Sequence, residues 1–184
     1  FWVGTMVMDM ASNRGLGGLY CLDERGLTGP HVAGLYTPNG SAFSPNGSVF
    51  YLSDSHSLSQ EVWAFDYDAQ NGTLSRRRPY IDMRPRPGRP DGAAVDMQGN
   101  YWICGNDAGQ VHCFNPQGAL LKSLDVPFPK PAMCCFGGAK MDLLFVTSIV
   151  PGAGFQGDVG LSGAVVALKP DTQGMPEPRF SRFP

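Results

Sequence analysis

The fold is decided by a turn-and-strand stretch that recurs along the chain: Ser44-Pro-Asn-Gly-Ser-Val-Phe-Tyr-Leu-Ser-Asp54. Its second copy is Asp96-Met-Gln-Gly-Asn-Tyr-Trp-Ile-Cys-Gly-Asn106, and its third is Gly137-Gly-Ala-Lys-Met-Asp-Leu-Leu-Phe-Val-Thr-Ser148. Each copy places a Gly-containing turn before a largely apolar run and ends on a polar residue, which is the pattern of a buried strand bounded by turns. Residues 1–6 match the end of a fourth copy.

The copies recur at about the length of one propeller blade. When Trp2, Tyr51, Trp102 and Phe145 are aligned, the intervals are 49, 51 and 43 residues, and β-propeller blades repeat on about that scale. We interpret these runs as the inner strands of successive blades. Alternating outer strands are expected between them, at residues 18–23, 62–66, 110–115 and 163–168. The sequence therefore predicts an all-β chain with four blades, each four-stranded.

The composition favours the same class. The 24 Gly and 16 Pro exceed a fifth of the 184 residues, and the hydrophobic fraction is 42%. This combination is typical of short strands joined by tight turns rather than of disorder. No apolar stretch reaches the ~20 residues that a membrane helix needs, so we expect no membrane partner.

The charge pattern argues against a nucleic-acid partner. The net charge is -2, and only 16% of residues are charged. The basic residues cluster in a turn-rich stretch beside Asp66, Asp68 and Asp82, where we favour a solvated connection over a phosphate-binding patch. This cluster consists of Arg76, Arg77, Arg78, Arg84, Arg86 and Arg89.

The cysteines indicate a reducing environment. There are five, an odd number, and none belongs to a CxxC motif. Most lie in apolar strand contexts, where a free thiol behaves as a small hydrophobic side chain. We therefore expect a cytoplasmic protein. Cys134 and Cys135 are interpreted as packing residues near the propeller axis, because no charged partner that would activate a thiol lies nearby in the sequence.

Two similar elements carry the candidate site residues. Asn39 stands in Thr37-Pro-Asn-Gly40 and Asp91 in Arg89-Pro-Asp-Gly92, each directly before a strand and 52 residues apart. Equivalent positions in adjacent blades point at one axis, where an amide oxygen and a carboxylate could bind Ca²⁺, Mg²⁺, Mn²⁺ or Zn²⁺. The spacing alone leaves a second interpretation open, since both sequences are also ordinary turns.

Other polar residues have weaker patterns. Asp54 ends a strand and either orients Asn39 or caps the strand end. Asp96 precedes a turn, and a structural role is favoured. The same holds for His31, His56 and His112, because no two histidines have zinc-ligand spacing.

Several motifs, in order along nearly the whole chain, resemble the regucalcin (senescence marker protein 30)/gluconolactonase family. The longest are Pro38-Asn-Gly-Ser-Ala-Phe-Ser-Pro-Asn-Gly-Ser-Val-Phe-Tyr-Leu-Ser-Asp-Ser55 and Pro90-Asp-Gly-Ala-Ala-Val-Asp-Met-Gln-Gly-Asn-Tyr-Trp102. The shorter ones are Val62-Trp-Ala-Phe-Asp-Tyr-Asp68, Gly72-Thr-Leu-Ser-Arg-Arg77, Cys134-Cys-Phe-Gly-Gly138 and Leu144-Phe-Val-Thr-Ser148. The resemblance implies a six-bladed propeller with one axial divalent metal ion. We expect one propeller domain over residues 1–184 that lacks the N-terminal blades.

The resemblance also assigns roles to residues. It places metal ligands at Asn39 and Asp91, gives Asp91 the catalytic role of activating water, and places a substrate contact at Asp9, where relatives can have Glu. The third metal ligand is a Glu that this stretch does not contain. The implied activity is metal-dependent hydrolysis of a sugar-acid lactone, with a small-molecule sugar lactone as the partner. Two alternatives are a calcium-binding regulatory propeller without turnover and an idle propeller used as an interaction scaffold.

Overall fold

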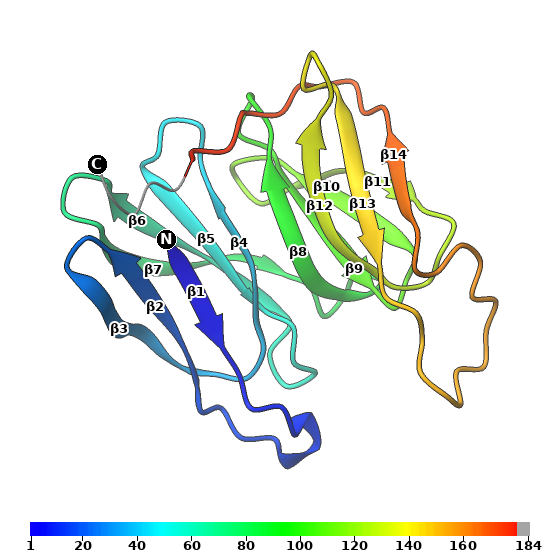
Figure 1. The fold of residues 1–184 in the computed structure, drawn as a ribbon, viewed down its shortest axis with the longest axis horizontal. Coiled ribbons are helices and arrows are strands. Elements are labelled where there is room, and N and C mark those ends of the chain that lie inside the picture. The colour runs from blue at the N-terminus through cyan, green and yellow to red at the C-terminus, as the bar shows by residue number, and fades with distance from the viewer. Residues whose placement is uncertain (180–184) are drawn as a thin grey trace.

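The computed structural model describes residues 1–179, which form fourteen strands, one short 3-10 helix and no α-helix (Figure 1). The strands make four antiparallel sheets, which we call blades 1 to 4. Blade 1 contains β1 (Trp2–Thr5), β2 (Gly17–Asp23) and β3 (Gly26–Leu35), with η1 (Met10–Ser12) between β1 and β2. Blade 2 contains β4 (Pro38–Phe43), β5 (Val49–Asp54), β6 (Glu61–Asp68) and β7 (Thr73–Asp82). Blade 3 contains β8 (Arg89–Val95), β9 (Tyr101–Asn106), β10 (Gln110–Phe114) and β11 (Leu120–Asp125). Blade 4 contains β12 (Pro131–Gly137), β13 (Leu143–Ser148) and β14 (Val165–Leu168).

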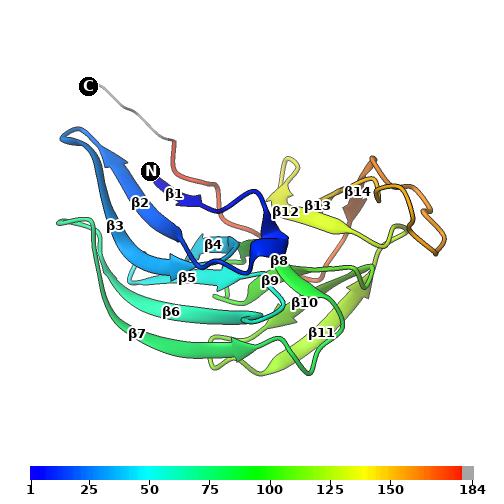
Figure 2. The ribbon, with the colours of Figure 1, turned by 90° about the horizontal axis from the view of Figure 1, so that it is seen from below.

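The blades follow one another in an arc, with β4, β8 and β12 on its inner side and β7 and β11 on its outer side (Figure 2). β8 packs against both β4 and β12. This arrangement confirms the predicted all-β propeller class with four blades. No helix among residues 1–179 is long and apolar enough to cross a membrane.

Two details of the predicted strand arrangement are wrong. The recurring runs are β1, β5, β9 and β13, and in blades 2 to 4 these are the second strands, since β4, β8 and β12 lie inside them. The repeat is strongest there because β5 and β9 are buried almost throughout, whereas β4 and β8 contain Pro, Gly and a break in register. In addition, blades 1 and 4 have three strands within residues 1–179, not four.

Both faces of β5 and β9 are buried, because blades 2 and 3 each share a core with the blade on either side. Phe50 belongs to the core between blades 1 and 2, and its neighbour Tyr51 to the core between blades 2 and 3. In β9, Tyr101 faces blade 2 and Trp102 faces blade 4. Successive residues of a strand point to opposite faces. A strand between two cores therefore has no polar face, which explains the continuous apolar runs.

Asp96 has the structural role favoured from the sequence. Its carboxylate is fully buried and accepts hydrogen bonds from the Asn100 amide nitrogen, 2.9 Å, the Trp102 indole nitrogen, 3.0 Å, and the Thr172 hydroxyl, 3.1 Å. Gly174 also pairs with Asp96 across an isolated β-bridge. The segment after β14 is thereby held across the ends of the inner strands that lie opposite Asn39 and Asp91 (Figure 1).

Half of the arginine cluster lies on the outer surface, in a strand rather than in the connection expected from the sequence. Arg76, Arg77 and Arg78 lie within the outermost strand β7. Arg76 and Arg78 both pair with Asp66, while Arg77 stacks 3.9 Å from the centroid of the Trp63 ring. The partners of these three arginines therefore come from within blade 2, whereas Arg89 pairs with Asp107 after β9.

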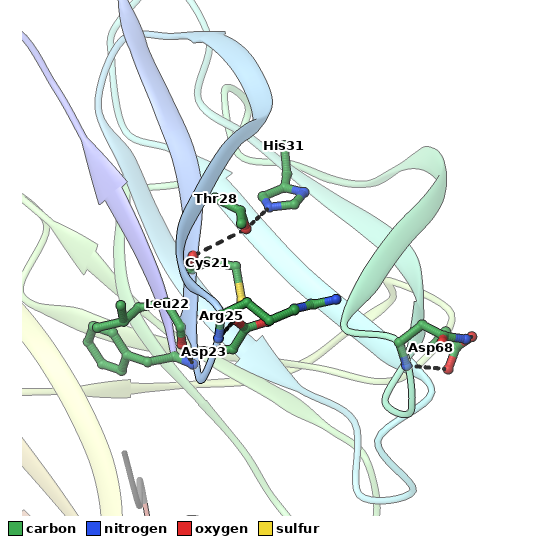
Figure 3. A network of polar contacts seen from close by, with 9 residues as sticks. Cys21, Leu22, Asp23, Arg25, Thr28, His31 and Asp68 are labelled. Carbon is green, nitrogen blue, oxygen red and sulfur yellow. Dashed lines mark hydrogen bonds and ion pairs between the residues drawn. The ribbon is translucent and has the colours of Figure 1, made fainter. Parts of the chain in front are cut away.

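His31 and His112 have structural surroundings, as favoured from the sequence. His31 Nε2 contacts Thr28 Oγ1 at 2.9 Å near the β2–β3 turn, which the Asp23–Arg25 pair closes (Figure 3). His112 is 1% exposed, and its ring nitrogens contact Ser123 Oγ at 2.7 Å and the Pro87 carbonyl oxygen at 2.9 Å. All five cysteines are free, and Cys134 is buried in the core between blades 3 and 4, whereas Cys135 is exposed.

His112 predicts a loss of stability in mild acid. Burial lowers the pKa of its imidazole, so between the folded and the ordinary pKa the unfolded chain binds a proton that the folded chain does not. The free energy of unfolding should fall as the pH drops through the ordinary imidazole value of ~6.5, by at most about 1.4 kcal/mol at pH 5.5 from this group. Urea denaturation at pH 7.5 and 5.5 measures it. His112→Gln should lose this part of the pH dependence, whereas the exposed His31→Gln should keep it; equal slopes for both variants would contradict the assignment.

Candidate functional site

Asn39 and Asp91 occupy matching places on neighbouring inner strands. Asn39 is the second residue of β4 and Asp91 the third residue of β8, so they lie inside strands rather than in the turns expected before them. The ladder to the next strand shifts register at both places: directly after Asn39, between Asn39 and Ala42, and around Asp91, between Pro90 and Ala93. Such irregularities re-aim side chains and are common beside functional sites. The Pro-Asn-Gly and Pro-Asp-Gly elements, which are also ordinary turn sequences, therefore form register shifts near the starts of β4 and β8.

Both residues line one pocket of about 330 Å³ on the inner side of the arc. The pocket is also lined by the residue directly before β12 and by the loop after β13. One part of its wall is polar and another part is apolar. The polar lining residues are Thr37, Asn39, Ser55, Arg89, Asp91, Asn106 and Lys130, and the others are Met6, Pro90, Ile149, Val150, Pro151 and Gly152.

Asn39 is tied to the strand that carries Asp91. Its Nδ2 donates to Ser55 Oγ at 2.9 Å, and the Ser55 hydroxyl donates in turn to the carbonyl oxygen of Pro90. Because the amide nitrogen is engaged, the orientation of the amide group is fixed. Among residues 1–179, no hydrogen bond is donated to Asn39 Oδ1, so this oxygen is available as a ligand.

Asp91 is held by a second bridge, which spans blades 3 and 4. Asn106 Nδ2 donates to Asp91 Oδ2 at 2.8 Å and to the Pro131 carbonyl oxygen at 3.2 Å. Ser55 and Asn106 are both buried, at 5% exposure. Sequence reasoning missed both as site residues, although Asn106 is the polar end of the second repeat copy.

Partial burial changes the acidity of Asp91. Loss of water raises the pKa of the carboxyl to about 6, although the Asn106 hydrogen bond and the nearby Arg89 oppose this rise. At neutral pH the group is therefore mainly ionised but close to its pKa. A carboxylate with a pKa near the working pH is suited to accept and return a proton.

Asp54 supports the start of β4 rather than the side chain of Asn39. Its carboxylate accepts backbone N–H groups of Tyr36, 2.8 Å, Thr37, 2.9 Å, and His56, 3.1 Å. Of the two roles left open for Asp54, the structure thus shows the capped strand end. It fixes the backbone two residues before Asn39.

Asp9 does not join the other predicted site residues. It is exposed, and its carbonyl oxygen accepts hydrogen bonds from the backbone and the hydroxyl of Ser12 at η1. Met6, from the same segment, lines the pocket, whereas Asp9 is absent from the lining. A substrate contact at Asp9 stays a prediction.

Comparison with known proteins identifies the family. Residues 1–150 match the SMP-30/Gluconolactonase/LRE-like region. The chain belongs to the SMP-30/gluconolactonase family. It is 34% identical to regucalcin of Danio rerio over 93% of the chain and 55% of that protein. It is 33% identical to the 6-deoxy-6-sulfogluconolactonase of Pseudomonas putida over 98% of the chain and 62% of that protein.

A solved structure confirms the fold. The crystal structure of a calcium-binding protein, regucalcin, from Agrobacterium tumefaciens superposes with a TM-score of 0.85 at 24% identity, covering 96% of the chain and 59% of that structure. The chain thus spans less than two thirds of the length of the relatives it matches.

The donor set of the pocket fits part of a metal site. An amide oxygen and a carboxylate suit hard divalent ions such as Ca²⁺, Mg²⁺ and Mn²⁺. Within residues 1–179, no group of three or more His, Cys, Asp or Glu side chains could hold an ion. Asn39 and Asp91 could contribute two oxygen donors to an ion, which is fewer than a complete coordination shell needs.

Ser55→Ala tests the bridge between the two strands. The change leaves Asn39 Nδ2 without its acceptor and the Pro90 carbonyl without its donor. It should lower the free energy of unfolding by about 1–3 kcal/mol, the usual effect of leaving buried polar groups unpaired. Urea denaturation measures the difference. The control is Ser57→Ala, an exposed serine two residues away, which should change stability by less than about 0.5 kcal/mol; similar effects for both would show that the bridge contributes nothing.

Proposed function

We propose that the protein hydrolyses a lactone of a sugar acid in the pocket lined by Asn39 and Asp91, with one divalent metal ion. The observation that carries the proposal is that Asn39 and Asp91, on neighbouring inner strands, line one pocket in a chain of this family. The name of the Pseudomonas putida relative, a sulfogluconolactonase, supports the substrate class.

The chain's residues divide the work of the proposed reaction. Asn39 and Asp91 hold the ion, and the ion supplies Lewis-acid polarisation of the lactone carbonyl when bound. Asp91 accepts a proton from the attacking water as the water oxygen bonds to the lactone carbonyl carbon. The ester bond to the ring oxygen then breaks, and the proton passes to that oxygen to give the hydroxy acid. Asn106 keeps the carboxylate in place through the 2.8 Å hydrogen bond.

Asp91→Asn tests the catalytic assignment. The variant keeps the shape and an acceptor for Asn106 but loses the charge that binds the ion and the base that accepts the proton. Hydrolysis of D-glucono-1,5-lactone, followed by acid release, should fall at least about a hundredfold, as expected for the loss of a catalytic base. Chelator treatment of the wild-type protein should cause a similar loss.

The matched control is Asp125→Asn, an exposed residue of β11 hydrogen-bonded to Gln110. Its activity should stay at the wild-type level. Full activity of both Asp91→Asn and the chelated protein would overturn the metal-dependent mechanism. Ion binding without turnover of any sugar lactone would instead support the calcium-binding alternative.

Asn39→Ala tests the second ligand by binding rather than by turnover. Loss of one oxygen ligand should weaken Ca²⁺ or Mn²⁺ binding by about tenfold or more, corresponding to ~1.4 kcal/mol. Calorimetric titration measures the affinity, and the shift of the melting temperature at a fixed ion concentration should shrink accordingly. Asn71→Ala, at an exposed turn asparagine, is the control. An unchanged affinity in Asn39→Ala would remove Asn39 from the ligand set.

A further inference from the structure

Two cationic side chains line the pocket beside Asp91. Arg89 is the first residue of β8, and Lys130 directly precedes β12. Both are ion-paired with one carboxylate, that of Asp107 in the turn after β9: Arg89 Nε lies 2.7 Å from Oδ2, and Lys130 Nζ contacts Oδ1. Two positive charges thus share one negative charge, and Asp107 itself does not line the pocket.

Arg89 and Lys130 each have N–H groups that the contact with Asp107 does not use. Only Nε of the Arg89 guanidinium donates to Asp107, and among residues 1–179 its terminal nitrogens donate no hydrogen bond. Lys130 likewise donates only to Asp107, which leaves two of the three ammonium protons. A ligand group that accepts several hydrogen bonds could therefore bind here without displacing Asp107.

The backbone holds this trio in place. Gly88 has φ +81°, and a Cβ there would lie 2.5 Å from the Gly105 backbone, so only glycine allows the chain entering Arg89 to approach β9 so closely. Asp107 also has a left-handed conformation, φ 79°, which is uncommon for a residue other than glycine. Burial opposes ionisation of Asp107, but Lys130 and Arg89 outweigh it and lower the pKa of the carboxyl.

Other shared carboxylates in the described chain lie elsewhere. Arg76 and Arg78 share Asp66, but their side chains are 82% and 45% exposed on the outer strand β7. The side chains of Arg89 and Lys130 are 32% and 21% exposed and lie in the pocket that carries the candidate catalytic carboxylate. Arg89 and Lys130 therefore differ from Arg76 and Arg78 in their position in the pocket and in their lower exposure.

We propose that Arg89 and Lys130 form a subsite for a negatively charged oxyanion substituent, so that the preferred lactone is an anionic sugar lactone rather than a neutral one. The inference rests on the proposed function. Arginine and lysine are the side chains that bind such groups most strongly. The apolar wall formed by Met6, Ile149 and Val150 offers no partner to a charge, which places the anionic group on the side of the two cations.

The test compares two lactones that differ at one carbon. D-Glucaro-1,4-lactone has a carboxylate where D-glucono-1,4-lactone has a hydroxymethyl group. The wild-type protein should have the lower KM for the glucarolactone. Arg89→Gln and Lys130→Gln should each shift the ratio of the two KM values toward the neutral lactone by about tenfold, the loss of one charge-assisted contact. Asp107→Asn should shift the ratio the opposite way, because it frees both cations.

Arg84→Gln is the control, because Arg84 pairs with Asp82 and Glu61 at the end of β7; its KM ratio should be that of the wild type. The proposal is overturned if the wild type prefers the neutral lactone, or if all three trio variants shift the ratio in one direction, as a purely structural role would. If neither of these lactones nor D-glucono-1,5-lactone is hydrolysed, the proposed function fails. The anion subsite is then tested separately by calorimetry. The ratio of the dissociation constants of the same two lactones is measured for the wild type and for the same variants.

Discussion

The structure depends on the burial of both faces of the second strand in each four-stranded blade. Tyr101 and Trp102, one residue apart on β9, belong to two different cores. The apolar area removed from water at each such strand is the main stabilising contribution to the fold. It also places β9 between blade 2 residues on one face and blade 4 residues on the other.

This sharing of cores brings the inner strands together and so creates the site. Once blades 2, 3 and 4 are packed side by side, the first residues of β4 and β8 lie at one end of adjoining strands. The bridges through Ser55 and Asn106 then run between blades, from Asn39 to Pro90 and from Asp91 toward Pro131. The polar site is thus held by hydrogen bonds that exist only because the apolar interfaces are formed. The side chains of Asn39 and Asp91 are thus held in place by the fold itself before any ligand binds.

The sequence predicts the blades and two of the site residues. The identity of the innermost strands and the partners of the site residues depend on how the strands are ordered in space. The spacing of the repeat predicts the number of blades, and the matching Pro-Asn-Gly and Pro-Asp-Gly elements predict two candidate ligands at the same level. The spacing could not identify the innermost strand, because β4 and β8 are broken by a shift in register and lack a continuous apolar run. Ser55 and Asp107 have no sequence pattern of their own, and the only signal for Asn106 is its place at the polar end of a repeat copy. Each gains its partner from a strand or blade that is distant in sequence.

The segment after β14, which the Thr172–Asp96 hydrogen bond holds in place, lies at only one end of the inner strands β4 and β8. Met175 to Pro178 lie beside Phe43 and Val95, at the far ends of β4 and β8, where they border a separate cavity. Asn39 and Asp91 lie at the other ends. The two ends of these strands therefore differ in their surroundings: the segment after β14 borders one end, and the polar pocket lies at the other.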